Sequence, residues 1–163
     1  MSKLLVVMAV VAFVPLFGAD PASADAYGHL QGHLWRYCLA NRDGNISAEW
    51  CDVTDGRQDW GLEIVAYVNG DPRYRVRHLE SNRCLVGPAS GPVRMSGCAS
   101  QYADQVWGFQ YQYSHPVDHL PYYWLRNKAT GKCLVMNFSR ATQVFMFPCA
   151  DYKDQYFLAP GST

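Results

Sequence analysis

Short runs in which hydrophobic and polar residues partly alternate make up most of the chain beyond residue 25. Residues 74–79 and 122–126 are rich in aromatic or β-branched side chains, which is typical of half-buried β-strands. Turn-forming pairs such as Asp43-Gly44 and Asn69-Gly70 separate the runs and suit tight hairpins. No window beyond the first 24 residues keeps the apolar period of a helix. The pattern predicts an all-β domain that closes, or nearly closes, into a barrel, because closure leaves few exposed strand edges.

The N-terminal segment differs from the rest of the chain. Lys3 precedes an almost unbroken apolar run at residues 4–17, which is too short to span a membrane. Ala22-Ser23-Ala24 then has the small-x-small pattern that signal peptidase cleaves. We expect residues 1–24 to be a signal peptide and residues 25–163 to form one secreted domain without membrane insertion.

The expected domain contains the same arrangement of residues three times. Each copy has a Cys-Leu pair, a second cysteine, and a glutamine followed two positions later by an aromatic residue. The Cys-Leu pairs start at Cys38, Cys84 and Cys133, the second cysteines are Cys51, Cys98 and Cys149, and the last segments are Gln58-Asp59-Trp60, Gln105-Val106-Trp107 and Gln155-Tyr156-Phe157. Units this small must share a core. We expect repeats at about 27–66, 72–113 and 121–160, with Gln58, Gln105, Gln155 and the three aromatic rings in equivalent inward positions.

The six cysteines all lie in the expected exported part, where an even number indicates disulfides. Because equivalent cysteines should have equivalent partners, the repeat predicts one local bridge per copy. The predicted bridges are Cys38–Cys51, Cys84–Cys98 and Cys133–Cys149. A zinc site is the alternative, but the chain has no C-x-x-C segment. No metal and no other cofactor is expected.

The charge balance of the chain and its lack of catalytic motifs argue against two classes of function. Acidic and basic residues balance at 14 each, so there is no cationic excess for binding nucleic acid. There is no Gly-x-Ser-x-Gly segment and no cysteine is left over as a nucleophile. Pairs such as Asp151 and Asp154 lie in polar turn segments, where solvated Asp is common. We therefore expect a protein that is not an enzyme and does not bind nucleic acid.

The tandem pattern Cys-Leu, Cys, Gln-x-aromatic resembles the ricin B-type β-trefoil lectin family. It is clearest in the second and third copies, where Cys84-Leu85-Val86 and Cys133-Leu134-Val135 lead to Gln105-Val106-Trp107 and Gln155-Tyr156-Phe157. The resemblance covers essentially the whole mature chain. It implies a trefoil of twelve strands, four per repeat, with a disulfide inside each. Trefoil subunits of cytolethal distending toxins are also similar.

The sugar-binding residues of that family are only partly present. A binding repeat of the family has Asp after Cys-Leu, an aromatic ring about two residues before the second cysteine, and Asn before the glutamine. In the three repeats, the Asp position holds Ala40, Val86 and Val135. The aromatic position holds Glu49, Ser96 and Phe147. The Asn position holds Arg57, Asp104 and Asp154. The third repeat keeps a partial set in Phe147 and Asp154, with Asn137 as a substitute polar group. The alternative is that Phe147 packs on Pro148 and Asp154 caps a turn.

The first repeat offers a weaker set, Trp50 and Asp43, although Asp43-Gly44 also fits a simple hairpin turn. The second repeat offers no sugar site. The segment 111–123 is dense in Tyr, His and Pro, which suits a glycan or protein interface or a loop covering the end of the barrel.

Two functions follow from these residues and the resemblance. The first is a secreted lectin that binds cell-surface carbohydrate through a non-standard site. The second is a receptor-binding or scaffold subunit of a secreted toxin complex, which binds a co-secreted protein. A secreted enzyme inhibitor is a lesser alternative.

Overall fold

The computed structural model describes residues 26–33, 36–137 and 143–160. The expected signal peptide lies outside the described residues. The strands are β1 (Ala26–Gly28), β2 (Gln31–Gly32), β3 (Tyr37–Arg42), β4 (Asn45–Trp50), β5 (Trp60–Val68), β6 (Asp71–His78), β7 (Arg83–Val86), β8 (Arg94–Gly97), β9 (Val106–Ser114), β10 (Pro121–Asn127), β11 (Cys133–Asn137), β12 (Gln143–Phe147) and β13 (Tyr156–Leu158). Three one-turn 3-10 helices accompany them: η1 (Gly56–Gln58), η2 (Ala103–Gln105) and η3 (Lys153–Gln155).

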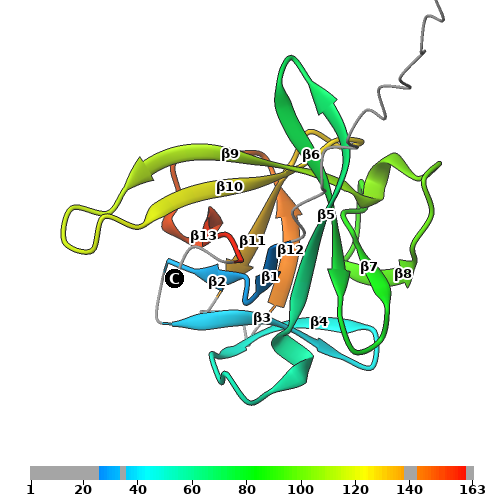
Figure 1. Ribbon diagram of the computed structural model, residues 1–163, viewed down its shortest axis with the longest axis horizontal. Helices are drawn as coiled ribbons and strands as arrows, with labels where there is room; N and C mark the ends of the chain where they lie inside the picture. Colours follow the sequence, from blue (N-terminus) through cyan, green and yellow to red (C-terminus); the bar gives the residue numbers. More distant parts are fainter. Residues whose placement is uncertain (1–25, 34–35, 138–142, 161–163) are drawn as a thin grey trace, which may run out of the picture.

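All strand pairs of the described residues are antiparallel, and they close into a barrel (Figure 1). The barrel order is β1–β5–β6–β9–β10–β13–β2. The remaining strands form the hairpins β3–β4, β7–β8 and β11–β12, and β4 also pairs with β8 and β12. Three hairpins joined to a closed barrel, with four strand positions per repeat, make a β-trefoil. The predicted all-β trefoil is therefore confirmed.

One strand position of the first repeat is split, which gives thirteen strands in place of the expected twelve. His29 and Leu30 separate β1 from β2, and Leu30 is fully buried in the core. The two halves have different partners, because β1 pairs with β5 whereas β2 pairs with β13 and β3. The equivalent strands β6 and β10 are continuous.

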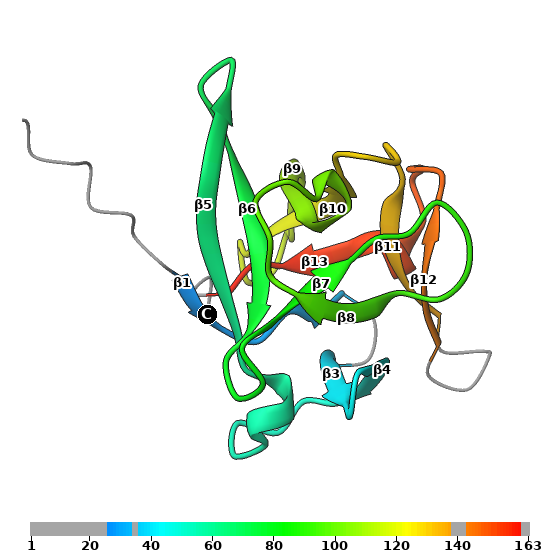
Figure 2. The same cartoon turned by 90° about the vertical axis from the view of Figure 1, so that its right-hand side faces the viewer.

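Two hairpins turn at the predicted Asp-Gly and Asn-Gly steps. Asp43 and Gly44 have φ angles of 52° and 93° and connect β3 to β4. Asn69 and Gly70 have φ angles of 54° and 86° and connect β5 to β6. Positive φ at both central residues matches the right-handed twist of the flanking strands. The long β5–β6 hairpin stands away from the barrel (Figure 2).

The core repeats around the threefold axis. Trp60, Trp107 and Phe157 are all fully buried, together with the leucine of each Cys-Leu pair. The indole N–H of Trp60 donates to the Leu39 carbonyl at 2.8 Å, and that of Trp107 donates to the Leu85 carbonyl at 3.1 Å. The phenyl ring of Phe157 has no N–H, so the third repeat keeps the ring packing without this hydrogen bond.

The glutamine of each repeat holds the backbone on both sides of the second cysteine. Its amide nitrogen donates to the preceding carbonyl, and its amide oxygen accepts from the following N–H. The acceptors are Trp50, Gly97 and Pro148, and the donors are Asp52, Ala99 and Ala150, at 2.7–3.0 Å. Because all three glutamines are buried, both ends of each amide need these partners.

Each repeat also contains its own disulfide. The bridges are Cys38–Cys51, Cys84–Cys98 and Cys133–Cys149, with Cα–Cα distances of 4.9–5.0 Å. This is the predicted pairing. Each bridge joins the Cys-Leu strand to the end of the following strand, next to the glutamine that holds the same backbone.

We expect Gln155→Ala to destabilise the protein by about 2–4 kcal/mol. The substitution leaves the Pro148 carbonyl and the Ala150 N–H without their partner, and each unpaired buried group costs about 1–3 kcal/mol. Gln101→Ala is the matched control, because Gln101 is exposed. Urea unfolding of both variants measures the difference. Equal stability of the two variants would contradict this role of Gln155.

Candidate functional site

The outer face of each hairpin carries the positions at which the resemblance expects sugar ligands. In the third repeat Cys133 pairs with Phe147 and Val135 pairs with Phe145, so these side chains share one face. Asn137 lies on the same face, at the end of β11. Val135 is buried, whereas the Phe147 side chain is 49% exposed. The face thus has an apolar floor and an accessible ring.

Asp154 approaches this face from η3, which packs against β11. Its Oδ1 is buried and accepts no hydrogen bond from the described residues. Burial raises the pKa of the Asp154 carboxyl above its usual 3.8. The equivalent residues of the first repeat, Arg57 and Glu49, are 3.6 Å apart. Asp154 and Phe147 occupy the positions of Arg57 and Glu49 in the third repeat.

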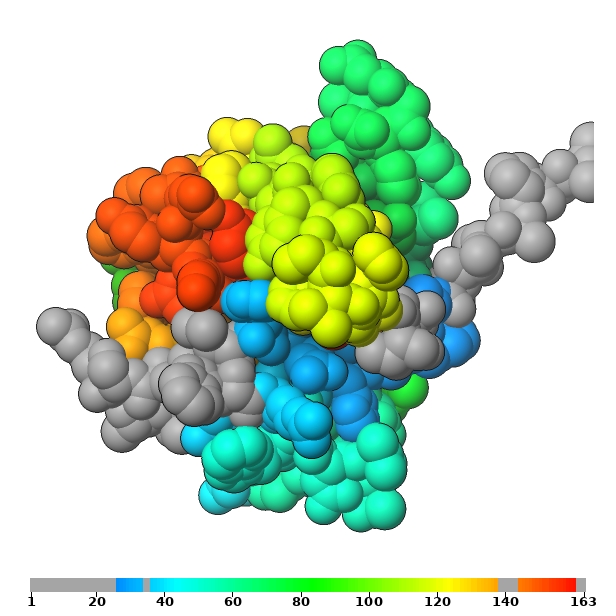
Figure 3. Space-filling view, turned by 90° about the vertical axis from the view of Figure 1, so that its left-hand side faces the viewer, coloured from blue at the N-terminus to red at the C-terminus, as the bar shows by residue number. Residues whose placement is uncertain are grey.

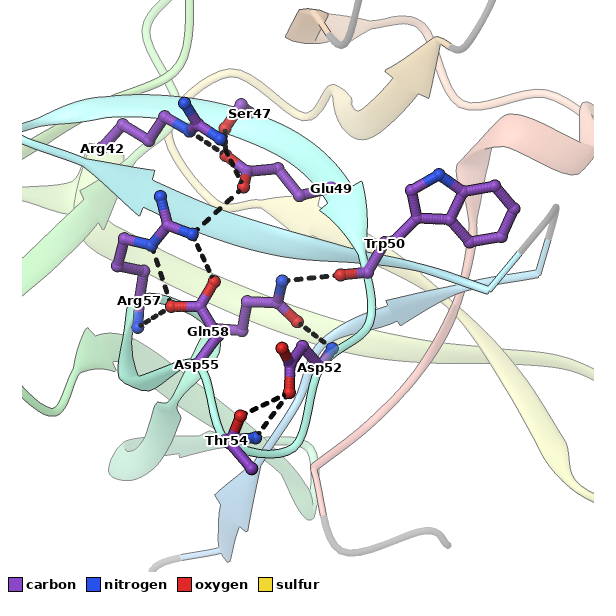
Figure 4. Close-up of polar contacts among 9 residues, drawn as sticks. All are labelled: Arg42, Ser47, Glu49, Trp50, Asp52, Thr54, Asp55, Arg57 and Gln58. Carbon is purple, nitrogen blue, oxygen red and sulfur yellow. Dashed lines mark hydrogen bonds and ion pairs between the residues drawn. The ribbon is translucent and has the colours of Figure 1, made fainter.

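The same positions of the first repeat form an ion-pair network (Figure 4). Glu49 accepts from both Nε and Nη2 of Arg42, the latter at 2.9 Å, and from Ser47 Oγ at 2.7 Å. Arg57 donates to Asp55 at 2.6 and 2.8 Å and lies beside Glu49. The hydrogen bond from Arg42 is the main cause that lowers the pKa of Glu49. Two arginines therefore neutralise two carboxylates where a sugar site would need a ring.

The structure does not bring Trp50 and Asp43 together. Trp50 is 64% exposed, stacks on Tyr37 with ring centroids 4.8 Å apart, and points away from the ion-pair network (Figure 4). Asp43 occupies the turn at the other end of β4, roughly 17 Å away by the rise per residue of a strand. The two residues cannot contact one sugar ring. The Trp50–Tyr37 stack was missed from sequence, because it depends on the β3–β4 register.

The second repeat has no ring on the equivalent face. Val86 is buried and pairs with Arg94, and Cys84 pairs with Ser96. The backbone carbonyl of Asp104 accepts from the Gly87 N–H at 2.9 Å and from Asn127 Nδ2 at 2.7 Å.

The segment 111–123 forms the end of the β9–β10 hairpin rather than a covering loop. Tyr122 is buried, stacks on Tyr113, and meets His33 edge-to-face with centroids 4.6 Å apart. Tyr113 also packs on Tyr156, whose pKa burial and the nearby Asp151 raise to about 12. One side of the hairpin is therefore anchored to the barrel, while other rings of the segment remain exposed.

Two further features of the described residues bear on function. They contain no group of three or more His, Cys, Asp or Glu side chains that could hold a metal ion. No helix in that part of the chain is long and apolar enough to cross a membrane.

Solved structures with the same fold are known. No protein-family model and no curated protein matches it. The BEL β-trefoil is similar over 87% of this chain and 96% of its own, with 16% identity and a TM-score of 0.67. The cytolethal distending toxin of Haemophilus ducreyi is similar over 83% of both chains, with 15% identity and a TM-score of 0.62. The hemolytic lectin CEL-III is 24% identical with a TM-score of 0.62, over 82% of this chain and 29% of its own. At these identities the likeness shows a β-trefoil fold.

We expect Glu49→Gln to lower stability at neutral pH but not in acid. The folded protein lowers the pKa of Glu49, so the stabilisation is fully present above the usual pKa of 4.5. It is lost as the pH falls through the lowered pKa. Glu80→Gln is the control, because Glu80 is exposed and has no ion pair within the described residues. Urea unfolding at about pH 7 and about pH 3 measures both variants. A Glu49→Gln effect of equal size at both pH values would argue against the ion pairs.

Proposed function

We propose that this chain is a secreted, non-catalytic member of the ricin B-type lectin family that binds cell-surface carbohydrate through its third repeat. The observation that carries the proposal is an exposed ring on β12 in the same repeat whose η3 holds an unsatisfied acceptor. Phe147 offers an accessible aromatic face, and Asp154 Oδ1 lacks a hydrogen-bond donor among the described residues. A hexose offers both an apolar face for the ring and hydroxyl donors for the carboxylate.

The site differs from a galactose site of the family at the residue that follows the Cys-Leu pair. Val135 replaces the family's Asp, so two charge-assisted hydrogen bonds to adjacent hydroxyls are missing. Such bonds are worth roughly 1.5–3 kcal/mol each. We therefore infer weak binding of simple galactosides and useful binding only of extended or clustered glycans. The hemolytic lectin CEL-III, similar in fold, supports the lectin function.

A second function is a subunit of a multi-protein secreted toxin, in which the trefoil contacts a protein partner. The likeness in fold to the Haemophilus ducreyi toxin over most of both chains supports it. So do two exposed tyrosines on the projecting hairpins, Tyr67 at 62% and Tyr111 at 57%.

Phe147→Ala should abolish glycan binding by the third repeat, because the sugar loses its stacking surface. Tyr102→Ala is the control, since Tyr102 is a half-exposed ring next to η2 in the second repeat. A glycan array of wild type and both variants, followed by titration with galactose and lactose, tests this. Tight binding of either simple sugar, or full binding by Phe147→Ala, would refute the proposed site. If no glycan binds and a co-secreted protein does, the toxin-subunit function replaces the lectin function.

Glycan binding should weaken as the pH falls. The loss should begin at a higher pH than it would if the acceptor were an exposed Asp. The ionised Asp154 carboxylate is the acceptor, and burial raises its pKa, so protonation begins earlier as the pH falls. Asp154→Asn should bind more weakly at neutral pH and lose this pH dependence. Titrating the best array ligand between about pH 7 and about pH 4 compares the two proteins. An identical pH profile for both would exclude Asp154 from the site.

A further inference from the structure

A second candidate binding site lies between the two projecting hairpins. The hairpins β5–β6 and β9–β10 both extend beyond the barrel (Figure 1). Viewed onto the end of β9–β10, the β5–β6 hairpin rises beside it (Figure 3). Residues at the end of β5, at the start of β6, along β9 and at or just after the end of β10 line a groove of about 560 Å³. This volume lies within the range of ligand sites. The groove shares no lining residue with the third-repeat site.

Three cations line this groove against one carboxylate. Arg73, Arg126 and Lys128 face a single acid, Asp71. Arg73 Nη1 donates to the Pro72 carbonyl at 3.1 Å, and Arg126 Nε donates to the Gly131 carbonyl at 3.0 Å. Within the described part of the chain, no salt bridge joins any of the three to a carboxylate. The groove cations are thus available to an anionic ligand, unlike the neutralised Arg42 and Arg57.

Gly108 leaves room for one of these cations. A Cβ at this residue would lie 3.3 Å from Nη1 and 3.6 Å from Cζ of Arg73. A larger residue would require the guanidinium to shift by a few tenths of an ångström. The Arg73 side chain, which comes from β6, therefore lies next to the β9 backbone.

The strand β9 has a free edge in this groove. It pairs with β6 only at Val106 and Trp107, but with β10 as far as Ser114. Continuing the β6 register would place Pro72 opposite Phe109. Proline has no N–H to donate to the ladder. This accounts for the separation of β6 from β9 at that point.

The alternation of the ladder shows which backbone groups face the groove. The Lys128 N–H donates to the Val106 carbonyl at 2.8 Å, so Val106 belongs to a hydrogen-bonded pair with the β10 side. Antiparallel pairs alternate along a strand. Gly108 and Gln110 therefore bond to β10, whereas the N–H and C=O groups of Phe109 point to the free edge, before the register of β9 and β10 shifts beside Tyr111.

Aromatic packing holds this edge in place. Phe109 contacts Tyr74 and Tyr123 edge-to-face, with centroids 5.4 and 5.9 Å apart. Tyr111 contacts Tyr123 in the same way at 6.1 Å. The edge of β9 is therefore a fixed template, and little ordering is required when a ligand binds.

We propose that the groove binds an acidic, extended peptide segment of a partner protein, which adds as a strand to the edge of β9. Backbone hydrogen bonds to Phe109 on this edge would hold the peptide, as in other cases of strand addition. Its carboxylates would meet Arg73, Arg126 and Lys128. The free edge favours a peptide over an acidic glycan, which has no regular backbone to pair with it. The inference names the partner class for the toxin-subunit function and does not depend on the glycan site.

The test uses the mature chain and a fluorescein-labelled peptide of alternating Glu and Val, measured by fluorescence anisotropy. The double variant Arg126→Glu/Lys128→Glu should weaken binding roughly tenfold or more, because two attractive charges become repulsive. Both side chains are exposed, so folding should persist, and Arg94→Glu, at an exposed position of β8, is the control for charge reversal outside the groove. A peptide N-methylated at alternate residues keeps its charge but loses the donors for strand addition, and it should not bind.

Equal binding of the N-methylated peptide, or no effect of the double variant, would overturn the proposal. Binding of a sulfated or sialylated oligosaccharide in place of the peptide, lost in the same double variant, would assign the groove to acidic glycans and also overturn it. Phe147→Ala should leave peptide binding unchanged. Failure of the groove is therefore distinguishable from failure of the third-repeat site.

Discussion

The structure depends on the buried amide of one glutamine in each repeat. Gln58, Gln105 and Gln155 each use both ends of the amide to fix the backbone around the second cysteine. A buried amide without partners would be costly, so this geometry is strongly specified. The glutamine ends a 3-10 helix that packs against the Cys-Leu strand. The residue before it is thereby held at the edge of the hairpin face.

This framework leaves the exposed positions free to diverge. Glu49 and Phe147 occupy equivalent places, yet one belongs to an ion-pair network and the other is an exposed ring. Arg57 and Asp154 also occupy equivalent places, yet Arg57 forms ion pairs whereas Asp154 Oδ1 has no hydrogen-bond partner among the described residues. The hydrophobic core does not involve these side chains, so their replacement changes the surface chemistry of the repeat while the trefoil fold is kept. Fold and binding chemistry are therefore separate properties of this chain.

Much of the fold could be predicted from sequence, because its determinants are local or repeat in register. The equivalence of the repeated cysteines predicted the three bridges, and Asp43-Gly44 predicted a turn. The features that sequence did not reveal depend on pairing between strands. Arg42 meets Glu49 only because β3 and β4 pair in one register, and the Tyr37–Trp50 stack has the same origin. Sequence analysis could nominate the third-repeat residues only through the family resemblance.

The groove between the hairpins β5–β6 and β9–β10 also could not be predicted from sequence, because it depends on pairing between strands. Its cause, a proline placed opposite Phe109, becomes visible only when β6 and β9 are aligned across the barrel. Pro72 ends one edge pairing and so leaves backbone groups of β9 without a strand beside them. The threefold repeat does not copy this feature, since β13, which occupies the position of β9 in the third repeat, is only three residues long. A symmetric core can therefore support two unlike surfaces, one on a hairpin face and one on a strand edge, each formed where a single repeat departs from its copies.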